Sequence, residues 1–170
     1  MNADQNQMNT VNAWRTPHRQ SGATGFTLVE ILIAITIIGA LLAIALPMYS
    51  TFKEQQNIAI AVSDLKGIDI YVSSHKVSSA QFPNSLSEVP RADRKDPWGN
   101  PYEYLKIQGD ETAVKGKMRR DKSTNPINTD FDPYSKGPDG ETSTQRNLKT
   151  GQDDIVRASD RGFFGPAAKF

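Results

Sequence analysis

The chain has 170 residues, enough for one ordinary domain preceded by a short N-terminal element, and its formal net charge of +1 gives no electrostatic reason to expect nucleic-acid binding. It has no cysteine, which excludes a disulfide framework, a thiolate metal site and a cysteine nucleophile. Mean hydropathy is −0.53 although 37% of the residues are hydrophobic, and much of that apolar content lies in one early segment. Any core formed after residue 53 is therefore expected to be small.

The early apolar segment predicts a membrane-spanning helix. Residues 31–52 form a run of 22 without a single charge, and a helix of that length spans roughly 33 Å, close to the ~30 Å of a hydrocarbon core. No face of the run is polar, which disfavours a buried core helix. Pro47 lies inside the pattern and leaves two outcomes open, a kink or local break in the helix or the end of the span near the membrane interface.

An ordinary secretory signal is the alternative for this segment. Arg15 and Arg19 form a weak basic region, and Ala43-Ile44-Ala45 mimics a small-x-small cleavage site, which predicts a mature chain starting at Leu46. The apolar run is longer than the ~7–15 residues of such a signal, and Glu30 interrupts its beginning. Both features favour a retained anchor.

The stretch GFTLVEILIAITIIGALLAIALP resembles the class III signal of type IV pilins and type II secretion pseudopilins. The resemblance implies that a prepilin peptidase cleaves after Gly25 at the cytoplasmic face and methylates the new amine of Phe26. Residues 1–25 are then a leader, and residues 26–52 are the transmembrane and filament-core helix. Glu30 takes the place of the family's assembly glutamate.

The physical chemistry of this segment supports the same roles. Cleavage creates a cationic amine at Phe26, one helical turn from Glu30. Because a carboxylate at membrane depth is costly unless it is paired, we expect Glu30 of an incoming subunit to pair with the amine of a neighbour. Pairing with its own amine before assembly stays open. The charges that flank the span give only weak support for its orientation, because the nearest cation before Gly25 is Arg19 and Lys53 follows the span. The cytoplasmic N-terminus is therefore implied by the resemblance.

The helical pattern continues beyond the span as an amphipathic stripe. Apolar residues recur every three or four positions, at Ile58, Ala61, Val62, Leu65, Ile68 and Val72. This period predicts one apolar helix face packed on a globular domain made of residues 53–170. Gly67 is the weak point of that continuous helix.

Turn signals and short strands are expected next. A loop with at most one short helix is predicted by four prolines: Pro83, Pro90, Pro97 and Pro101. DPWGNPYEYLKI predicts a turn followed by a strand, and DPWGNPYEY resembles the segment before the first strand of major pseudopilins. Trp98 is expected to fill the core rather than to bind a ligand. A second short strand is expected in TAVKGKMRR, residues 112–120.

Oxygen-bearing side chains between residues 128 and 160 suit a hard cation such as calcium. An EF-hand fails, because Pro133 occupies the position that needs glycine and no amphipathic helices flank the loop. YSKGPDG followed by DDI resembles the calcium-binding loop of major pseudopilins, which implies these ligands: a backbone carbonyl near Lys136 and the carboxylates of Asp139, Asp153 and Asp154. The insertion ETSTQRNLKTGQ is then expected to bulge outward. The alternative is that PDG is only a turn and DDI a helix cap.

No enzyme is expected. His18 and His75 lie far apart in the chain, and no Gly-rich phosphate loop, zinc motif or nucleophile elbow is present. The expected fold is α+β and type IV pilin-like. A long N-terminal helix, membrane-spanning in its first half, packs on a small antiparallel β-sheet that carries a metal-ordered C-terminal loop.

The resemblance to major pseudopilins implies a structural subunit that polymerises from the bacterial inner membrane into a periplasmic pseudopilus and helps to export folded proteins across the outer membrane. It implies a single-pass topology with the N-terminus cytoplasmic and the C-terminal domain periplasmic. The implied partners are other copies of the chain, other pseudopilins, the prepilin peptidase, the inner-membrane assembly platform and membrane lipid, with no nucleic acid. The alternatives are a type IV pilin, a minor pseudopilin, or a membrane-anchored calcium-binding or adhesion domain that never polymerises.

Overall fold

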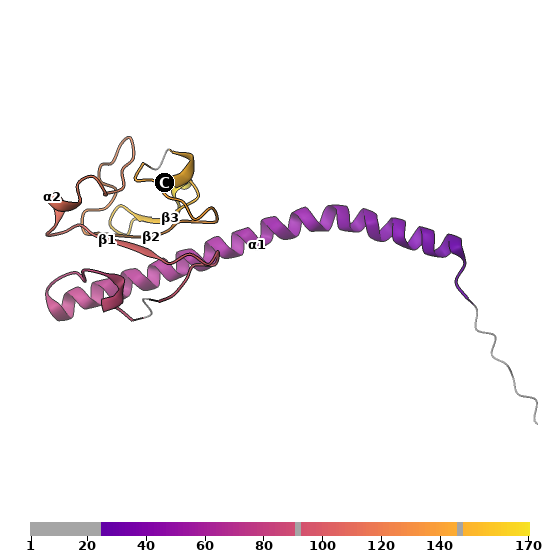
Figure 1. The fold of residues 1–170 in the computed structure, drawn as a ribbon, viewed down its shortest axis with the longest axis horizontal. Helices are drawn as coiled ribbons and strands as arrows, with labels where there is room; N and C mark the ends of the chain where they lie inside the picture. The colour runs from indigo at the N-terminus through magenta and orange to yellow at the C-terminus, as the bar shows by residue number, and fades with distance from the viewer. Residues whose placement is uncertain (1–24, 91–92, 146–147) are drawn as a thin grey trace, which may run out of the picture. The chain divides into compact units, whose positions relative to one another are not determined.

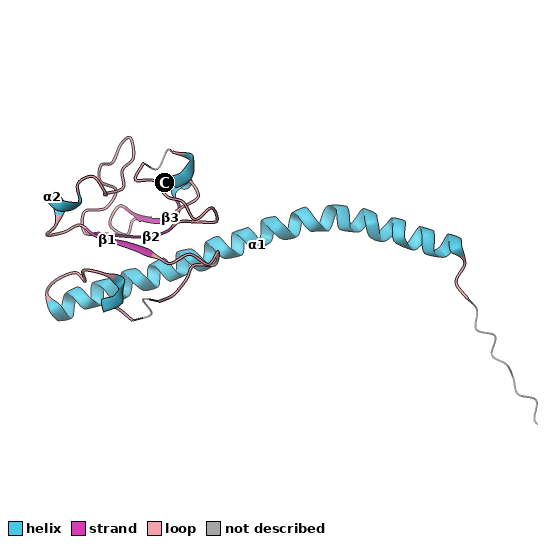
Figure 2. Cartoon of the chain, in the orientation of Figure 1, coloured by secondary structure: helices cyan, strands magenta, loops and turns pink. Residues whose placement is uncertain are grey.

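The computed structural model describes residues 25–90, 93–145 and 148–170. By contacts along the chain it divides into two compact units, Met1–Ile44 and Ala45–Phe170. Figure 1 follows the chain by residue number, and Figure 2 marks its helices and strands.

The longest element is helix α1 (Leu28–Ser79), which contributes to both units. It runs through Pro47 and Gly67 without interruption, so Pro47 does not break the helix. Of the predicted leader, Gly25 is described, and residues 1–24 lie outside the described residues.

The first part of α1 exposes its apolar side chains. Every residue from 25 to 53 is exposed. Of the described helices, α1 is long and apolar enough to cross a membrane, judged by length and composition. A continuous apolar surface of this size requires lipid or other helices around it.

The second unit contains a four-stranded antiparallel sheet with the strand order β1-β2-β3-β4. Its strands are β1 (Glu103–Lys106), β2 (Phe131–Ser135), β3 (Ile155–Ala158) and β4 (Phe163–Pro166). The small antiparallel sheet is therefore confirmed, as is the strand after the DPWGNP turn. Gly99 has φ of +97° in that turn, a conformation that glycine adopts without strain.

The second predicted strand, at residues 112–120, is wrong. The segment begins with the short helix α2 (Glu111–Val114), in which the Val114 N–H donates to the Asp110 carbonyl at 3.1 Å. Only Arg120 makes a bridge, with Gln145. The reason is that Ala113 and Val114 are adjacent rather than alternating, so an extended chain would have no continuous apolar face to bury.

The core lies between the sheet and the second part of α1. Ala61, Leu65 and Val72 are fully buried, which confirms the predicted stripe. They pack against six buried side chains: Phe82, Leu86, Val89, Tyr102, Phe131 and Ile155. Leu86 belongs to the 3₁₀ turn η1 (Leu86–Glu88), the short helix expected in the proline-rich loop. Trp98, predicted to fill the core, is partly buried and packs against this cluster, and its Nε1 donates to Glu54 Oε2 at 3.2 Å.

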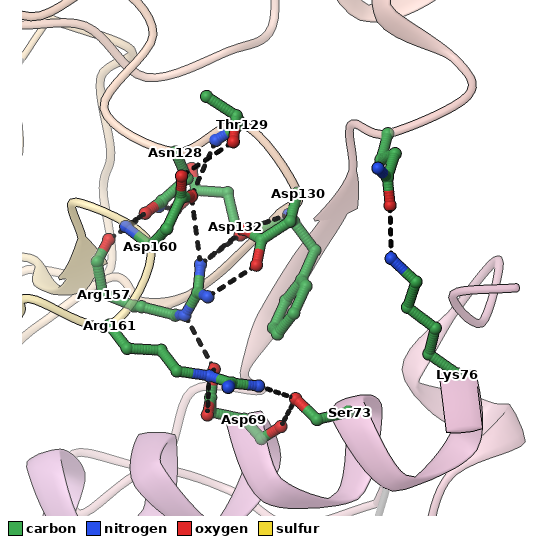
Figure 3. Close-up of polar contacts among 12 residues, drawn as sticks. Asp69, Ser73, Lys76, Asn128, Thr129, Asp130, Asp132, Arg157, Asp160 and Arg161 are labelled. Atoms are coloured by element: carbon green, nitrogen blue, oxygen red, sulfur yellow. Dashed lines mark hydrogen bonds and ion pairs between the residues drawn. The ribbon is translucent and has the colours of Figure 1, made fainter. Parts of the chain in front are cut away.

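A buried arginine links α1 to the sheet (Figure 3). The side chain of Arg157, on β3, has no solvent exposure, and its Nε donates to Asp69 Oδ1 of α1 at 2.7 Å. Its two Nη atoms donate to the two carboxylate oxygens of Asp130 at 2.7 Å each. The guanidinium lies 4.3 Å from the centre of the Phe131 ring. Arg161 also contacts Asp69, with its Nε 2.8 Å from Oδ2.

Candidate functional site

The predicted processing site lies on exposed chain immediately before α1. Phe26 is 83% exposed, and a side chain added at Gly25 would meet nothing within 4 Å. The Gly25–Phe26 bond is thus accessible to an enzyme, and neither residue is needed for packing within the described chain.

The predicted assembly residue Glu30 forms a capping box with Thr27. The Thr27 N–H and hydroxyl donate to Glu30 Oε2 at 2.8 and 2.7 Å, and the Glu30 N–H donates to Thr27 Oγ1 at 3.2 Å. The Thr27 carbonyl accepts the first helical hydrogen bond, from Ile31. Thr27 is therefore the N-cap of α1. Sequence reasoning missed it, although the T-x-x-E spacing before an apolar run is the signature of this motif.

The capping box places the Glu30 carboxylate at the very start of the helix. Phe26 directly precedes Thr27, so the amine created by cleavage would be one residue away from the group that Glu30 already binds. The structure therefore brings the three predicted N-terminal residues, Gly25, Phe26 and Glu30, into one short segment.

The second predicted site is the β2–β3 loop, residues 136–154. Its GPDG turn has two glycines at positive φ, Gly137 at +67° and Gly140 at +70°. The Gly137 N–H donates to Ser135 Oγ at 3.1 Å, and its carbonyl accepts from Asn100 Nδ2 at 3.0 Å. A Cβ at Gly137 would lie 2.5 Å from the Asp153 carbonyl oxygen. Only glycine therefore lets the two ends of the loop approach so closely.

This approach makes neighbours of Asp139 and Asp153. Burial and then the Asp139 charge raise the pKa of the Asp153 carboxyl. Asp153 Oδ1 is buried and has no hydrogen-bond partner within the part of the chain that the structure describes. Asp139 Oδ1 accepts from the Glu141 N–H at 2.8 Å. Because calcium binds carboxylate oxygens, these two side chains would supply two of the several oxygen ligands that such an ion takes.

The third predicted carboxylate, Asp154, contacts other groups. Its Oδ2 accepts from Arg119 Nη1 at 2.7 Å and from the Thr142 hydroxyl at 2.8 Å. Lys136 pairs through Nζ with Glu103 Oε1 at 2.7 Å. In the described ranges, acidic and histidine side chains form no group of three or more that could hold a metal. The loop thus brings two of the predicted ligand carboxylates together and directs the third toward an arginine.

Comparison with known proteins adds to this geometry. Residues 20–46, which include Gly25, Phe26 and Glu30, match the family described as "Prokaryotic N-terminal methylation motif". The type II secretion system core protein G of Pseudomonas aeruginosa is 26% identical over 145 residues, which covers 73% of this chain and 89% of that protein. The chain is thus pilin-like, with the N-terminal methylation motif, and is similar to type II secretion system core protein G over most of its length. This confirms the predicted family, and a structural subunit rather than an enzyme.

Two further core G proteins are similar to this chain over the same extent. That of Escherichia coli K12 is 28% identical over 145 residues, covering 73% of this chain and 88% of that protein. That of Aeromonas hydrophila is 26% identical over 146 residues, covering 74% and 90%. No solved structure matches the chain. Each of these relatives is thus matched over about three quarters of this chain.

Proposed function

We propose that this pseudopilin is cleaved after Gly25, N-methylated at Phe26 and polymerised from the bacterial inner membrane into a periplasmic pseudopilus that drives export of folded proteins across the outer membrane. The observation that carries the proposal is the exposed Gly25–Phe26 bond, which lies inside the methylation motif and directly before a capped helix whose first part is apolar and exposed. Such a helix needs a membrane before assembly and neighbouring helices after it.

The proposed orientation has a cytoplasmic N-terminus and a periplasmic C-terminal domain. Cleavage then occurs at the cytoplasmic face by the prepilin peptidase, and the assembly platform of the inner membrane adds subunits to the filament base. Within the filament, Glu30 of each new subunit pairs with the Phe26 amine of a neighbour. Other pseudopilins and membrane lipid complete the set of partners.

Substitution of Gly25 tests the processing step. Gly25→Val is expected to leave the precursor uncleaved, while the fold stays intact because an added Cβ meets nothing within 4 Å. Gly39→Ala is the matched control, since its Cβ also meets nothing, and it should be processed normally. The measurement is the mass and N-terminal sequence of the membrane-extracted chain, with N-methyl-Phe26 expected for the wild type. A wild-type chain that starts at Leu46 would refute the proposal and indicate an ordinary secretory signal.

We propose in addition that calcium binds between Asp139 and Asp153, with a backbone carbonyl near Lys136. The support is the proximity of the two carboxylates and the buried, unsatisfied Oδ1 of Asp153. A bound divalent cation would neutralise the repulsion between these two groups. Asp154, the third ligand that the resemblance implies, holds Arg119 through Oδ2, and its buried Oδ1 has no hydrogen-bond partner in the described chain.

Calcium binding predicts a ligand-dependent stability. Calcium at about 100 times its dissociation constant should stabilise the folded chain by about 2.7 kcal/mol. Asp153→Asn is expected to abolish the rise in melting temperature that calcium produces, whereas Asp160→Asn, which removes a carboxylate bound to Thr129 outside the loop, should retain it. The measurement is thermal unfolding of the full chain in detergent, with calcium or with a chelator. An unchanged wild-type melting temperature would rule the ion out.

A further inference from the structure

The side chain of Arg119 lies among several polar groups of the β2–β3 loop. It is 5% exposed, and its guanidinium binds three groups that come together only when the loop is folded. Nη1 donates to Asp154 Oδ2 at 2.7 Å and to the Ser143 carbonyl at 3.2 Å, and Nη2 donates to the Thr142 hydroxyl at 2.6 Å. A carboxylate, a carbonyl and a hydroxyl are also the oxygen ligands that a calcium ion takes.

Two groups of β2 complete the surroundings of Arg119. Asp132 Oδ2 lies 3.4 Å from Nε, and the side chains of both partners are almost fully buried. The guanidinium carbon lies 3.7 Å from the centre of the Tyr134 ring. Buried charges are stable in proteins when they are paired and hydrogen-bonded, and an arginine over an aromatic ring adds a cation–π contact. The loop is therefore anchored to the sheet through one side chain.

The neighbouring backbone holds the same inserted segment. The Arg120 N–H donates to the Thr144 carbonyl at 2.8 Å, next to the bridge between Arg120 and Gln145. A Cβ at Gly151 would lie 3.3 Å from the Ser143 carbonyl oxygen, so the returning chain packs closely on this segment. The first part of the insertion, residues 142–145, is thus tied to residues 119 and 120.

We propose that the guanidinium of Arg119 takes the place of a metal ion on Asp154. The inserted segment of the loop, described at residues 142–145 and 148–151, is then ordered without calcium. The proposal rests on the pseudopilin assignment only for the expectation that calcium orders this loop. Arg119 holds Asp154 Oδ2, and Asp154 Oδ1 is buried without a hydrogen-bond partner in the described chain. A cation at Oδ1 would lie beside the guanidinium and be repelled by it, so Arg119 weakens calcium binding at Asp154. A calcium ion bound by Asp139 and Asp153 would order the rest of the loop and not this inserted segment.

Hydrogen exchange of the full wild-type chain in detergent micelles tests the proposal. The amides of the described part of the inserted segment, residues 142–145 and 148–151, are expected to exchange at the same rate with calcium and with a chelator. Arg119→Met should raise their exchange roughly tenfold or more, as expected when a charged hydrogen bond is lost. Lys117→Met, which removes an exposed cation two residues before Arg119, should leave these amides unchanged. Unprotected wild-type amides in chelator would overturn the proposal.

A second measurement separates a specific role of Arg119 from general destabilisation. Removing the guanidinium frees the Asp154 carboxylate, so calcium is expected to slow exchange in Arg119→Met and not in the wild type. Asp154→Asn in that background should abolish this rescue. If calcium protects the wild type and Arg119→Met equally, Arg119 does not replace the metal. These readouts are independent of cleavage at Gly25, so they remain informative if the proposed filament function fails.

Discussion

Replacement of Glu30 by glutamine is expected to block pseudopilus assembly and to leave membrane insertion unchanged. Glutamine can keep the capping box, because its amide oxygen accepts from Thr27 as the carboxylate does. It cannot neutralise the Phe26 amine of a neighbouring subunit. A charge left unpaired at membrane depth costs about 2.5–3.5 kcal/mol, so assembly should fall by more than about tenfold. The measurements are the amount of sheared or cross-linked filament and the fraction of the chain in the membrane.

Glu30→Leu is the companion variant, because it removes both the charge and the capping group while sparing insertion. Loss of assembly in both variants supports the ion pair between subunits. Assembly that survives in Glu30→Gln and fails in Glu30→Leu would show that Glu30 acts through the Thr27 cap instead. Filaments or secretion unchanged in both variants would contradict the proposed role of Glu30 altogether.

Arg157→Met is expected to cause the largest loss of folding stability. The substitution leaves Asp69 and Asp130 without the buried guanidinium that pairs with both. Removal of one partner from a buried ion pair typically costs about 3–5 kcal/mol. Chemical denaturation of the full chain in detergent, monitored by circular dichroism, gives the free energy of unfolding.

Arg161→Met is the matched control for Arg157. Arg161 binds the same carboxylate of Asp69, but its side chain is 52% exposed. Pairs of this kind contribute about 0.2–1 kcal/mol, so the control should cost far less. Equal losses of unfolding free energy in the two variants would mean that the burial of Arg157 does not increase its contribution to stability.

Local sequence patterns were sufficient to predict the elements whose formation depends on residues close together in the chain. The apolar run and the three-to-four-residue stripe predict α1, since a helix buries whichever face its own periodicity creates. The turn chemistry of DPWGNPYEY likewise predicts β1. The Thr27 cap was also readable from its T-x-x-E spacing. The failed strand at residues 112–120 differs, because a short polar segment becomes a strand only if a sheet edge receives it.

The charged pairs that hold the globular unit could not be predicted in the same way. Arg157 and Asp69 are 88 positions apart, and Arg119 and Asp154 are 35 positions apart. The chain has 20 lysines and arginines and 19 acidic residues, and no periodicity indicates which of them meet. The choice of partner follows from the strand register and from the path of the loop.

The sequence by itself determined the pilin-like methylation motif around Gly25 and Phe26, an apolar helix long enough to span a membrane and a glutamate at its start, because these features are read within one short segment. The tertiary structure alone decided what surrounds Asp154. Its burial beside Arg119 arises when β2, β3 and the inserted segment close around one guanidinium, an arrangement created by long-range packing.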